Sequence, residues 1–164
     1  MVAMNIFGMA LDETSQAPIL ILKNENESMA LPIWIGAVEA MSISMALNNV
    51  PFPRPMTHDL LLASVRALGG KVSHVDILEI REGTFFAELV LEQNEKEVRI
   101  DCRPSDAIAV AVRSKSSIFV AQGVLDSAGV SGEALDKKIV RSDESDKWKD
   151  LLDSLDDAET KYKM

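Results

Sequence analysis

The sequence predicts an α+β fold in which two antiparallel β-meanders pack with three or more helices, followed by a C-terminal amphipathic helix. Twice along the chain, at residues 5–35 and 72–102, three short apolar runs are separated by polar turns. Each group of three runs precedes a segment whose apolar residues recur at helical spacing. Connections this short join antiparallel strands, because parallel strands need a crossover of roughly a dozen residues or more.

The strands of the first meander are expected at residues 5–11, 18–23 and 29–35. Pro32 lies in the third run and has no backbone N–H to donate, which predicts an edge strand or a bulge there. A helix is expected from Gly36 to about Asn48. Glu39 falls in its first turn, where a carboxylate is favourable.

The segment at residues 48–55 has three prolines in five residues and is therefore expected to be extended. Thr57 is expected to be the N-cap of a helix that runs from His58 to about Leu68 and ends at Gly69-Gly70. The strands of the second meander are then expected at residues 72–80, 84–92 and 97–102.

The next helix begins at the corner Arg103-Pro104 and is expected to end near Arg113. Small residues at Ala107, Ala109 and Ala111 allow close backbone approach, so this helix is predicted to pack centrally. It is followed by an expected short strand, a short helix or loop, and an irregular polar segment, at residues 118–120, 121–129 and 130–142.

The last part of the chain is charged but carries one apolar stripe. Trp148, Leu151, Leu152 and Leu155 recur at the spacing of one helix face, which predicts an amphipathic helix from Asp143. We therefore expect an α+β domain over residues 1–140 and a charged helical appendage over residues 141–164.

Composition restricts the possible partners. The net charge of −9 and the pI of about 4.7 argue against non-specific nucleic-acid binding through a basic surface, although a local basic site remains compatible with them. No run approaches the roughly 18 apolar residues that span a bilayer, so no membrane partner is expected. The N-terminus lacks the features of a signal peptide, and a single cysteine cannot form an internal disulfide, so a cytoplasmic location is expected.

The single cysteine, Cys102, has two interpretations. It precedes Arg103 near a helix start, and this surrounding could lower the pKa of its thiol. Alternatively, it is a small buried residue at the end of a strand, as free cysteines commonly are.

The most distinctive pattern is a corner that occurs twice, at residues 54–59 and 103–106, where an arginine and a proline are followed by a hydroxyl and a carboxylate. A helix N-terminus has unpaired N–H groups and about half a positive charge, and it therefore attracts anions. Arg54 and Arg103 stand just before two such ends, and arginine binds phosphate bidentately. Two corners that face each other would form a phosphate-sized site.

The same corners contain groups for proton transfer and for metal binding. His58 lies in the first turn of one helix and can exchange protons near neutral pH. Asp59, Asp101, Asp106 and Glu39 supply the oxygen atoms that a divalent metal such as Mg²⁺ or Mn²⁺ prefers.

A purely structural interpretation of the corners stays open. Thr57 and Ser105 are suitable helix caps, and Asp59 and Asp106 suit the positive ends of the helix dipoles. Each arginine would then only pair with the aspartate of the opposite corner.

The two histidines allow one further alternative. His58 and His74 could form an acid–base pair like that of a ribonuclease, but His74 lies within an alternating strand. No cluster of histidine and cysteine has the spacing of a zinc site.

Across about residues 4–130 the chain resembles the bifunctional nuclease (BFN) domain family. The motifs that carry this resemblance are Leu31-Pro32-Ile33-Trp34-Ile35-Gly36 with Glu39-Ala40, residues 52–61, and residues 101–108 followed by Ile118-Phe119-Val120. The resemblance implies an α+β domain, a homo-oligomer with a dimer favoured, and nuclease action on both DNA and RNA. It gives no residue a catalytic role, but the motif-dense positions include Arg54, Thr57, His58, Asp59, Arg103, Ser105 and Asp106.

The functional hypothesis is that the protein hydrolyses phosphodiester bonds. Arg54 and Arg103, with Thr57 and Ser105, would bind phosphate. His58 would act as acid or base, and Asp59, Asp106 or Asp101 would orient water or a metal, with Asp101 and Glu39 as the candidate metal ligands. The alternative is a non-catalytic oligomer that binds an anion or another ligand, or that has a regulatory role.

Overall fold

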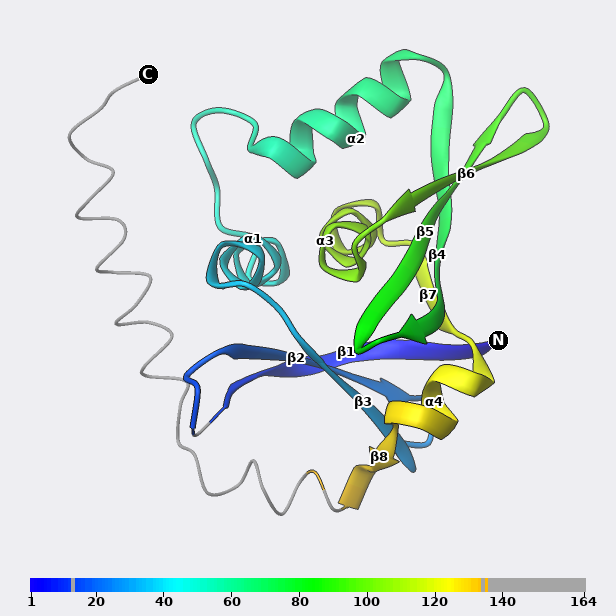
Figure 1. The fold of residues 1–164 in the computed structure, drawn as a ribbon. Coiled ribbons are helices and arrows are strands. Elements are labelled where there is room, and N and C mark those ends of the chain that lie inside the picture. Colours follow the sequence, from blue (N-terminus) through cyan, green and yellow to red (C-terminus); the bar gives the residue numbers. More distant parts are fainter. Residues whose placement is uncertain (13, 134, 136–164) are drawn as a thin grey trace.

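The computed structural model describes residues 1–12, 14–133 and 135 (Figure 1). Its helices are α1 (Ala37–Leu47), α2 (Thr57–Ala67), α3 (Pro104–Ser114) and α4 (Gln122–Ala128). Its strands are β1 (Val2–Leu11), β2 (Pro18–Asn24), β3 (Met29–Trp34), β4 (Gly70–Arg81), β5 (Thr84–Gln93), β6 (Lys96–Cys102), β7 (Ser117–Val120) and β8 (Val130–Ser131).

Both predicted meanders are present, and the α+β fold is confirmed. Strands β1, β2 and β3 pair antiparallel in sequence order, and so do β4, β5 and β6. The sequence did not indicate that the two meanders belong to one sheet of eight strands, in the order β6-β5-β4-β7-β1-β2-β3-β8. Strand β7 joins them, because it pairs parallel to β4 and antiparallel to β1.

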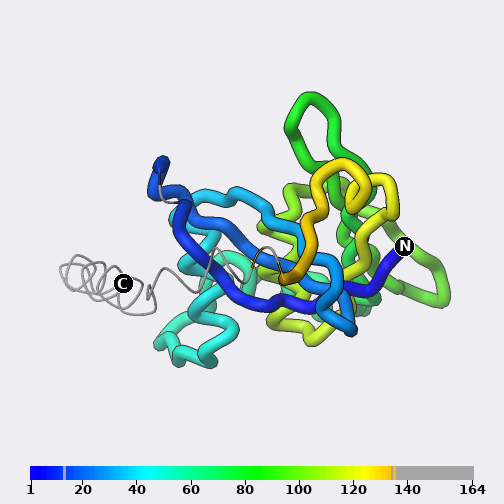
Figure 2. The backbone as a smooth tube through the Cα atoms, turned by 90° about the horizontal axis from the view of Figure 1, so that it is seen from below, coloured from blue at the N-terminus to red at the C-terminus, as the bar shows by residue number. Residues whose placement is uncertain are grey.

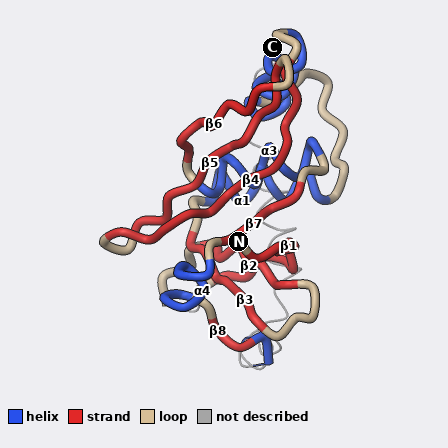
Figure 3. The backbone as a smooth tube through the Cα atoms, turned by 90° about the vertical axis from the view of Figure 1, so that its right-hand side faces the viewer, coloured by secondary structure: helices blue, strands red, loops and turns tan. Residues whose placement is uncertain are grey.

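The two meanders run at a steep angle to each other, and helices α1, α2 and α3 fill the angle between them (Figures 1 and 3). Helices α1 and α3 pack against each other, and α2 packs against α3 and β4. Helix α4 contacts β3 and β4. The hairpin loops of the second meander project away from this body (Figure 2). This arrangement brings the first turns of three helices to one side of the molecule.

Helix α3 is the central helix, as its small residues predicted. The residues buried in it are Pro104, Ser105, Ala107, Ile108, Ala109, Val110 and Ala111. Alanine side chains let the helix approach α1 and the sheet closely, while Ile108 and Val110 fill the space between them. The position of α3 is therefore fixed along its whole length, and its N-terminal corner is held in place with it.

We expect Ile108→Ala to lower the free energy of unfolding by about 2–5 kcal/mol, because it removes a fully buried side chain from the core and leaves a cavity. Denaturant unfolding followed by circular dichroism measures this change. The matched control is Val38→Ala, since Val38 lies on α1 with 71% of its surface exposed. The control should change stability by less than about 0.5 kcal/mol; equal losses in the two variants would contradict the central role of α3.

The N-cap predicted for α2 was wrong, whereas α3 begins at the Arg103-Pro104 corner as expected. The N-cap of α2 is Met56, not Thr57, because the carboxylate of Asp59 accepts the backbone N–H of Met56 at 2.9 Å and begins the helix there. The N-cap of α3 is Arg103, and the proline after it takes the first helical position. Ser105 is therefore not a cap.

Two further elements depend on long-range pairing. Strand β8 lies in a segment expected to be irregular, and it forms because Val130 and Ser131 pair with Ala30 and Met29 of β3. Since β8 covers only that end of β3, Pro32 lies where β3 is the edge of the sheet, as expected.

The predicted C-terminal helix and the proposed domain boundary at residue 140 lie outside the described residues. Within the described part of the chain, no helix combines the length and the apolar character needed to cross a membrane.

Candidate functional site

The two Arg-Pro corners meet in the folded chain. His58 in the first turn of α2 places its Nε2 3.2 Å from Oδ1 of Asp106 in the first turn of α3. The two residues are 48 positions apart in the sequence. His58 is largely buried, with 14% of its side chain exposed, whereas Asp106 is 32% exposed. The contact therefore lies at the edge of the core, within reach of solvent.

Arg103 joins a third helix to this contact. Its Nε and Nη2 donate to the two carboxylate oxygens of Asp106 at 2.7 and 3.1 Å, and its Nη1 donates to Oε1 of Glu39 at 2.8 Å. Glu39 lies in the first turn of α1, and its carboxylate folds back over Gly36, where a Cβ would collide with it. The positive ends of α1, α2 and α3 therefore converge on one group of side chains.

The second ring nitrogen of His58 is also engaged. Its Nδ1 lies 3.0 Å from Oγ of Ser42 on α1. Arg113, near the end of α3, donates from Nη2 to the carbonyl oxygen and to Oγ of Ser42 at 3.2 and 3.3 Å, and from Nε to Asp59 at 2.7 Å. The side chain of Arg113 is 10% exposed, so it ties α1, α2 and α3 together from inside.

Sequence reasoning missed Ser42 and Arg113, although their spacing held a signal. Ser42 lies three positions after Glu39, so the two share one face of α1. Arg113 lies seven positions after Asp106, which places both on one face of α3 two turns apart.

Both aspartates of the site stay ionised at neutral pH. Burial alone would raise the pKa of Asp106, but hydrogen bonds from Arg103 and His58 outweigh it and hold the pKa below its usual value. Burial likewise acts to raise the pKa of Asp59, and the backbone N–H of Met56 together with the guanidinium of Arg113 lowers it overall. The arginines thus keep two carboxylates charged beside His58.

We expect Asp59 to contribute stability that is lost in acid. Its folded pKa lies below the usual 3.8, so the contribution is complete above about pH 4 and disappears as the pH falls through the lowered folded pKa. Denaturant midpoints measured from pH 2.5 to 7 should fall less steeply below pH 4 for Asp59→Asn than for the parent. Asp101→Asn is the control, because Asp101 is exposed and has no ion pair with the described residues; an equal effect in both would contradict the assignment.

Four predicted site residues do not join this cluster of hydrogen bonds. Arg54, Thr57 and Asp101 are exposed and make no side-chain hydrogen bond or ion pair with the residues that the structure describes. Ser105 is buried, and its hydroxyl has no such partner in the same part of the chain. Arg103 pairs with the aspartate of its own corner rather than with that of the opposite one.

The second histidine belongs to a different group. Nε2 of His74 lies 3.4 Å from Oδ2 of the buried Asp76, and Arg99 donates to the same oxygen at 3.0 Å. Arg99 also binds Glu88 and Glu97, so it links three strands of the second meander. His58 and His74 therefore have separate sets of partners.

The carboxylates of the site do not fit a divalent metal as they are arranged. Arg103 binds Glu39 and Asp106, and Arg113 binds Asp59, so each carboxylate is already compensated by a guanidinium. Among residues 1–12, 14–133 and 135, no three side chains of histidine, cysteine, aspartate or glutamate group together as metal ligands. Asp101 lies outside the hydrogen-bonded cluster.

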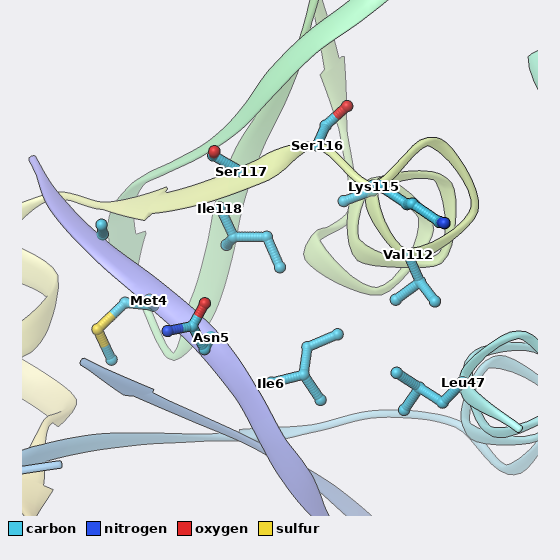
Figure 4. Close-up of a pocket in the computed structure, with 11 residues that line it drawn as sticks. Met4, Asn5, Ile6, Leu47, Val112, Lys115, Ser116, Ser117 and Ile118 are labelled. Atoms are coloured by element: carbon cyan, nitrogen blue, oxygen red, sulfur yellow. The ribbon is translucent and has the colours of Figure 1, made fainter. Parts of the chain in front are cut away.

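A cavity of about 290 Å³ lies elsewhere, between β1, β7 and the C-terminal ends of α1 and α3 (Figure 4). Ile6, Leu47, Val112 and Ile118 give it an apolar wall, and Lys115 stands at its side. None of the side chains that meet at the two corners lines this cavity. The corner cluster instead reaches solvent through Arg103, whose side chain is 65% exposed.

Cys102 is half-buried at the end of β6, and the lowered pKa considered for its thiol is wrong. Burial is the main cause that raises the pKa of its thiol to about 11, and the charges of Asp101 and Asp106 add to the effect. Its Sγ donates to the carbonyl oxygen of Ala87 on the neighbouring strand at 3.6 Å. The thiol is therefore protonated at neutral pH.

The model of the bifunctional nuclease domain matches residues 20–133. The chain belongs to this family.

Individual relatives agree with this assignment. An uncharacterized protein of Mycobacterium tuberculosis is 36% identical over 154 residues, which cover 92% of each chain. A protein of Arabidopsis thaliana named bifunctional nuclease 1 is 32% identical over 114 residues, 67% of this chain and 35% of that protein. A rice protein named bifunctional nuclease 2 is 29% identical over 130 residues, 77% of this chain and 40% of that protein.

Proposed function

We propose that this protein is a nuclease that hydrolyses phosphodiester bonds of DNA and RNA at the cluster where the two corners meet. The observation that carries the proposal is the contact of His58 with Asp106 directly beside the exposed guanidinium of Arg103. The family and the names of its plant members support the same activity.

Arg103 is the proposed phosphate-binding group. Its guanidinium holds Asp106 in the two-pronged geometry that it can also offer to a phosphate. Because most of this side chain is exposed, a substrate phosphate can take the place of a carboxylate without unfolding the site. Arg54 is exposed just before α2 and provides a second contact for a polymeric anion, with Thr57 beside it.

The helix N-termini add a fixed positive field. The backbone N–H of Ser105 lies in the first turn of α3, where N–H groups have no acceptor within the helix, and this is the contribution that we propose for Ser105. A phosphate near Arg103 would also lie near the first turns of α1 and α2. This local field operates although the net charge of the whole chain is negative.

His58 and Asp106 are the proposed acid–base pair. Nε2 of His58 contacts a carboxylate that stays ionised, which stabilises the imidazolium form during proton transfer. In the observed arrangement both ring nitrogens of His58 have hydrogen-bond partners. A proton can therefore pass between His58 and the substrate by way of the Ser42 hydroxyl, or directly from Nε2 once Asp106 has moved away. Asp59 has a supporting role, because it orients Arg113.

The direct test is cleavage of single-stranded DNA and of RNA by the purified protein, in EDTA and with added Mg²⁺ or Mn²⁺. The proposal expects cleavage that co-purifies with the chain and is lost in Arg103→Met/His58→Gln. Equal cleavage by the parent and by this double variant would assign the activity to a contaminant or another site. The EDTA arm separates cleavage by the described side chains from cleavage that needs a metal.

A second candidate is a non-catalytic oligomer that binds an anion at the same cluster. The observation that favours it is that every charged group at the corners except Arg54 is already paired. Binding of a short oligonucleotide without turnover, lost in the double variant, would support this candidate.

We also propose that the protein is a homodimer joined along β6. This edge strand has seven residues, whereas β8 at the other edge has two. Val98 and Ile100 on β6 are 41% and 42% exposed, although they pair beside core positions of β5. A long, uncovered edge strand that carries exposed apolar side chains is a template for pairing with another chain, and a second copy of β6 is complementary to it.

Ile100→Lys is expected to convert this dimer to a monomer, because it places a charged ammonium group among the apolar side chains beside the paired strands in both copies. Size-exclusion chromatography with light scattering measures the mass. Val130→Lys is the control, since Val130 is an exposed apolar residue on the opposite edge. A parent protein that is monomeric at micromolar concentration, or a dimer that Ile100→Lys leaves intact, would contradict the interface.

A further inference from the structure

A continuous line of hydrogen bonds joins Ser42, His58 and Asp106. The groups at its two ends fix which atom donates and which accepts in each of these bonds. Arg113 can only donate, so Oγ of Ser42 accepts from it at 3.3 Å. The hydroxyl hydrogen of Ser42 is then free to point at Nδ1 of His58, 3.0 Å away. At the other end the ionised carboxylate of Asp106 can only accept, so Nε2 of His58 carries the proton.

This direction defines the tautomer of the neutral imidazole. Nδ1 is the unprotonated nitrogen, and it faces a hydroxyl group. Nε2–H is held by a carboxylate that would stabilise the positive charge if Nδ1 took up a proton. A hydroxyl beside a base, with the base oriented by a third group, is the arrangement that activates a nucleophile.

The location of Ser42 places it beside the proposed phosphate site. Ser42 lies on the same face of α1 as Glu39, three residues or about 4.5 Å further along the axis. Arg103 binds Glu39 directly, so a phosphate held by Arg103 would lie next to Oγ of Ser42. Arg113 already donates to this oxygen from within the core and therefore holds Oγ of Ser42 in place.

We propose that Ser42 is the nucleophile of this site and that cleavage passes through a covalent phosphoserine diester; the inference rests on the proposed nuclease function. His58 Nδ1 takes the proton of Ser42 as the Oγ–P bond forms and the bond from phosphorus to the leaving oxygen breaks. The same proton then passes from Nδ1 to the leaving oxygen.

Water completes the reaction in a second step. It attacks phosphorus and gives a proton to Nδ1, the Oγ–P bond breaks, and Oγ of Ser42 recovers a proton from His58. The net change is one phosphodiester and one water converted to an alcohol and a phosphate monoester. Asp106 stays ionised throughout and stabilises the imidazolium in both steps.

A fluorophosphonate probe tests the nucleophile without requiring nuclease turnover. We expect one adduct per chain in intact mass spectrometry, located on Ser42 by peptide mapping. Ser42→Ala and His58→Gln should lower the labelling rate at least 100-fold, roughly the contribution of general-base catalysis. Ser44→Ala is the control, because Ser44 is the other serine of the same helix and hydrogen-bonds with Asn48 instead.

The outcomes separate this inference from the proposed function. Absence of an adduct on Ser42 in the unmodified protein, or nucleic-acid cleavage by Ser42→Ala at the parent rate, would overturn the nucleophile; in the second case the nuclease function stands. An adduct on Ser42 in a protein that cleaves neither DNA nor RNA would support the nucleophile and overturn the nuclease function. A burst of one p-nitrophenolate per chain from bis(p-nitrophenyl) phosphate would support both.

Discussion

His58→Gln is expected to lower kcat/KM for phosphodiester cleavage by about 10²–10⁴-fold, the usual contribution of a positioned acid or base. Glutamine is close to histidine in length and can hydrogen-bond with both Ser42 and Asp106, the present partners of the ring. It cannot take up and release a proton near neutral pH. The loss would therefore come from proton transfer rather than from a collapsed site.

The chain offers a matched control for this prediction. His74→Gln removes the other histidine, which also contacts a hydroxyl and a carboxylate but lies in the separate group with Asp76. Its kcat/KM should stay within about twofold of the parent value. Initial rates on a fluorescent oligonucleotide, with denaturant midpoints to confirm folding, provide the comparison; equal losses in the two variants would remove His58 from the mechanism.

Arg103→Met is expected to lower kcat/KM about 10²–10³-fold, because it removes the charged donors proposed to stabilise the reacting phosphate. Methionine keeps most of the apolar length of the side chain. Arg103→Lys should recover only part of the loss, since an ammonium cannot reproduce the two-pronged hydrogen bonds that Arg103 now makes to Asp106.

The control for Arg103 is Arg81→Met. Arg81 is exposed to nearly the same extent, 63% against 65%, and also pairs with a carboxylate, but it lies at the end of β4 away from the corners. Arg81→Met should leave the rate of cleavage unchanged. It should weaken oligonucleotide binding only by the small amount expected for the loss of one distant positive charge. A loss as large as that of Arg103→Met would indicate a general charge effect in place of a specific phosphate contact.

Local patterns in the sequence were sufficient to predict the strands of both meanders and the helices α1, α2 and α3. Alternating and continuous apolar runs, turn residues and the Arg-Pro corners depend on neighbours in the chain, and so their consequences can be derived from it. The position of β7 in the sheet could not be derived, because nothing in its four residues indicates which two strands it pairs with.

Only part of the candidate site could likewise be predicted from local patterns in the sequence. The corners identified His58, Arg103 and Asp106 because helix starts have a local chemistry. Ser42 and Arg113 were missed because their contact spans 71 positions and becomes apparent only when α1 and α3 lie side by side.

The failure at Thr57 has a local cause. Asp59, two positions later, competes for the start of α2 and bonds the N–H of Met56, so the helix begins one residue earlier than the hydroxyl suggested.

In the proposed nuclease, the two corners act as one site through His58 and Asp106. A double-mutant cycle on kcat/KM with His58→Gln, Asp106→Asn and the combined variant tests this claim most directly. We predict that each single change lowers kcat/KM at least about tenfold and that the combined variant is little slower than His58→Gln alone. Losses that multiply in the combined variant, or an Asp106→Asn protein with the parent rate, would contradict it.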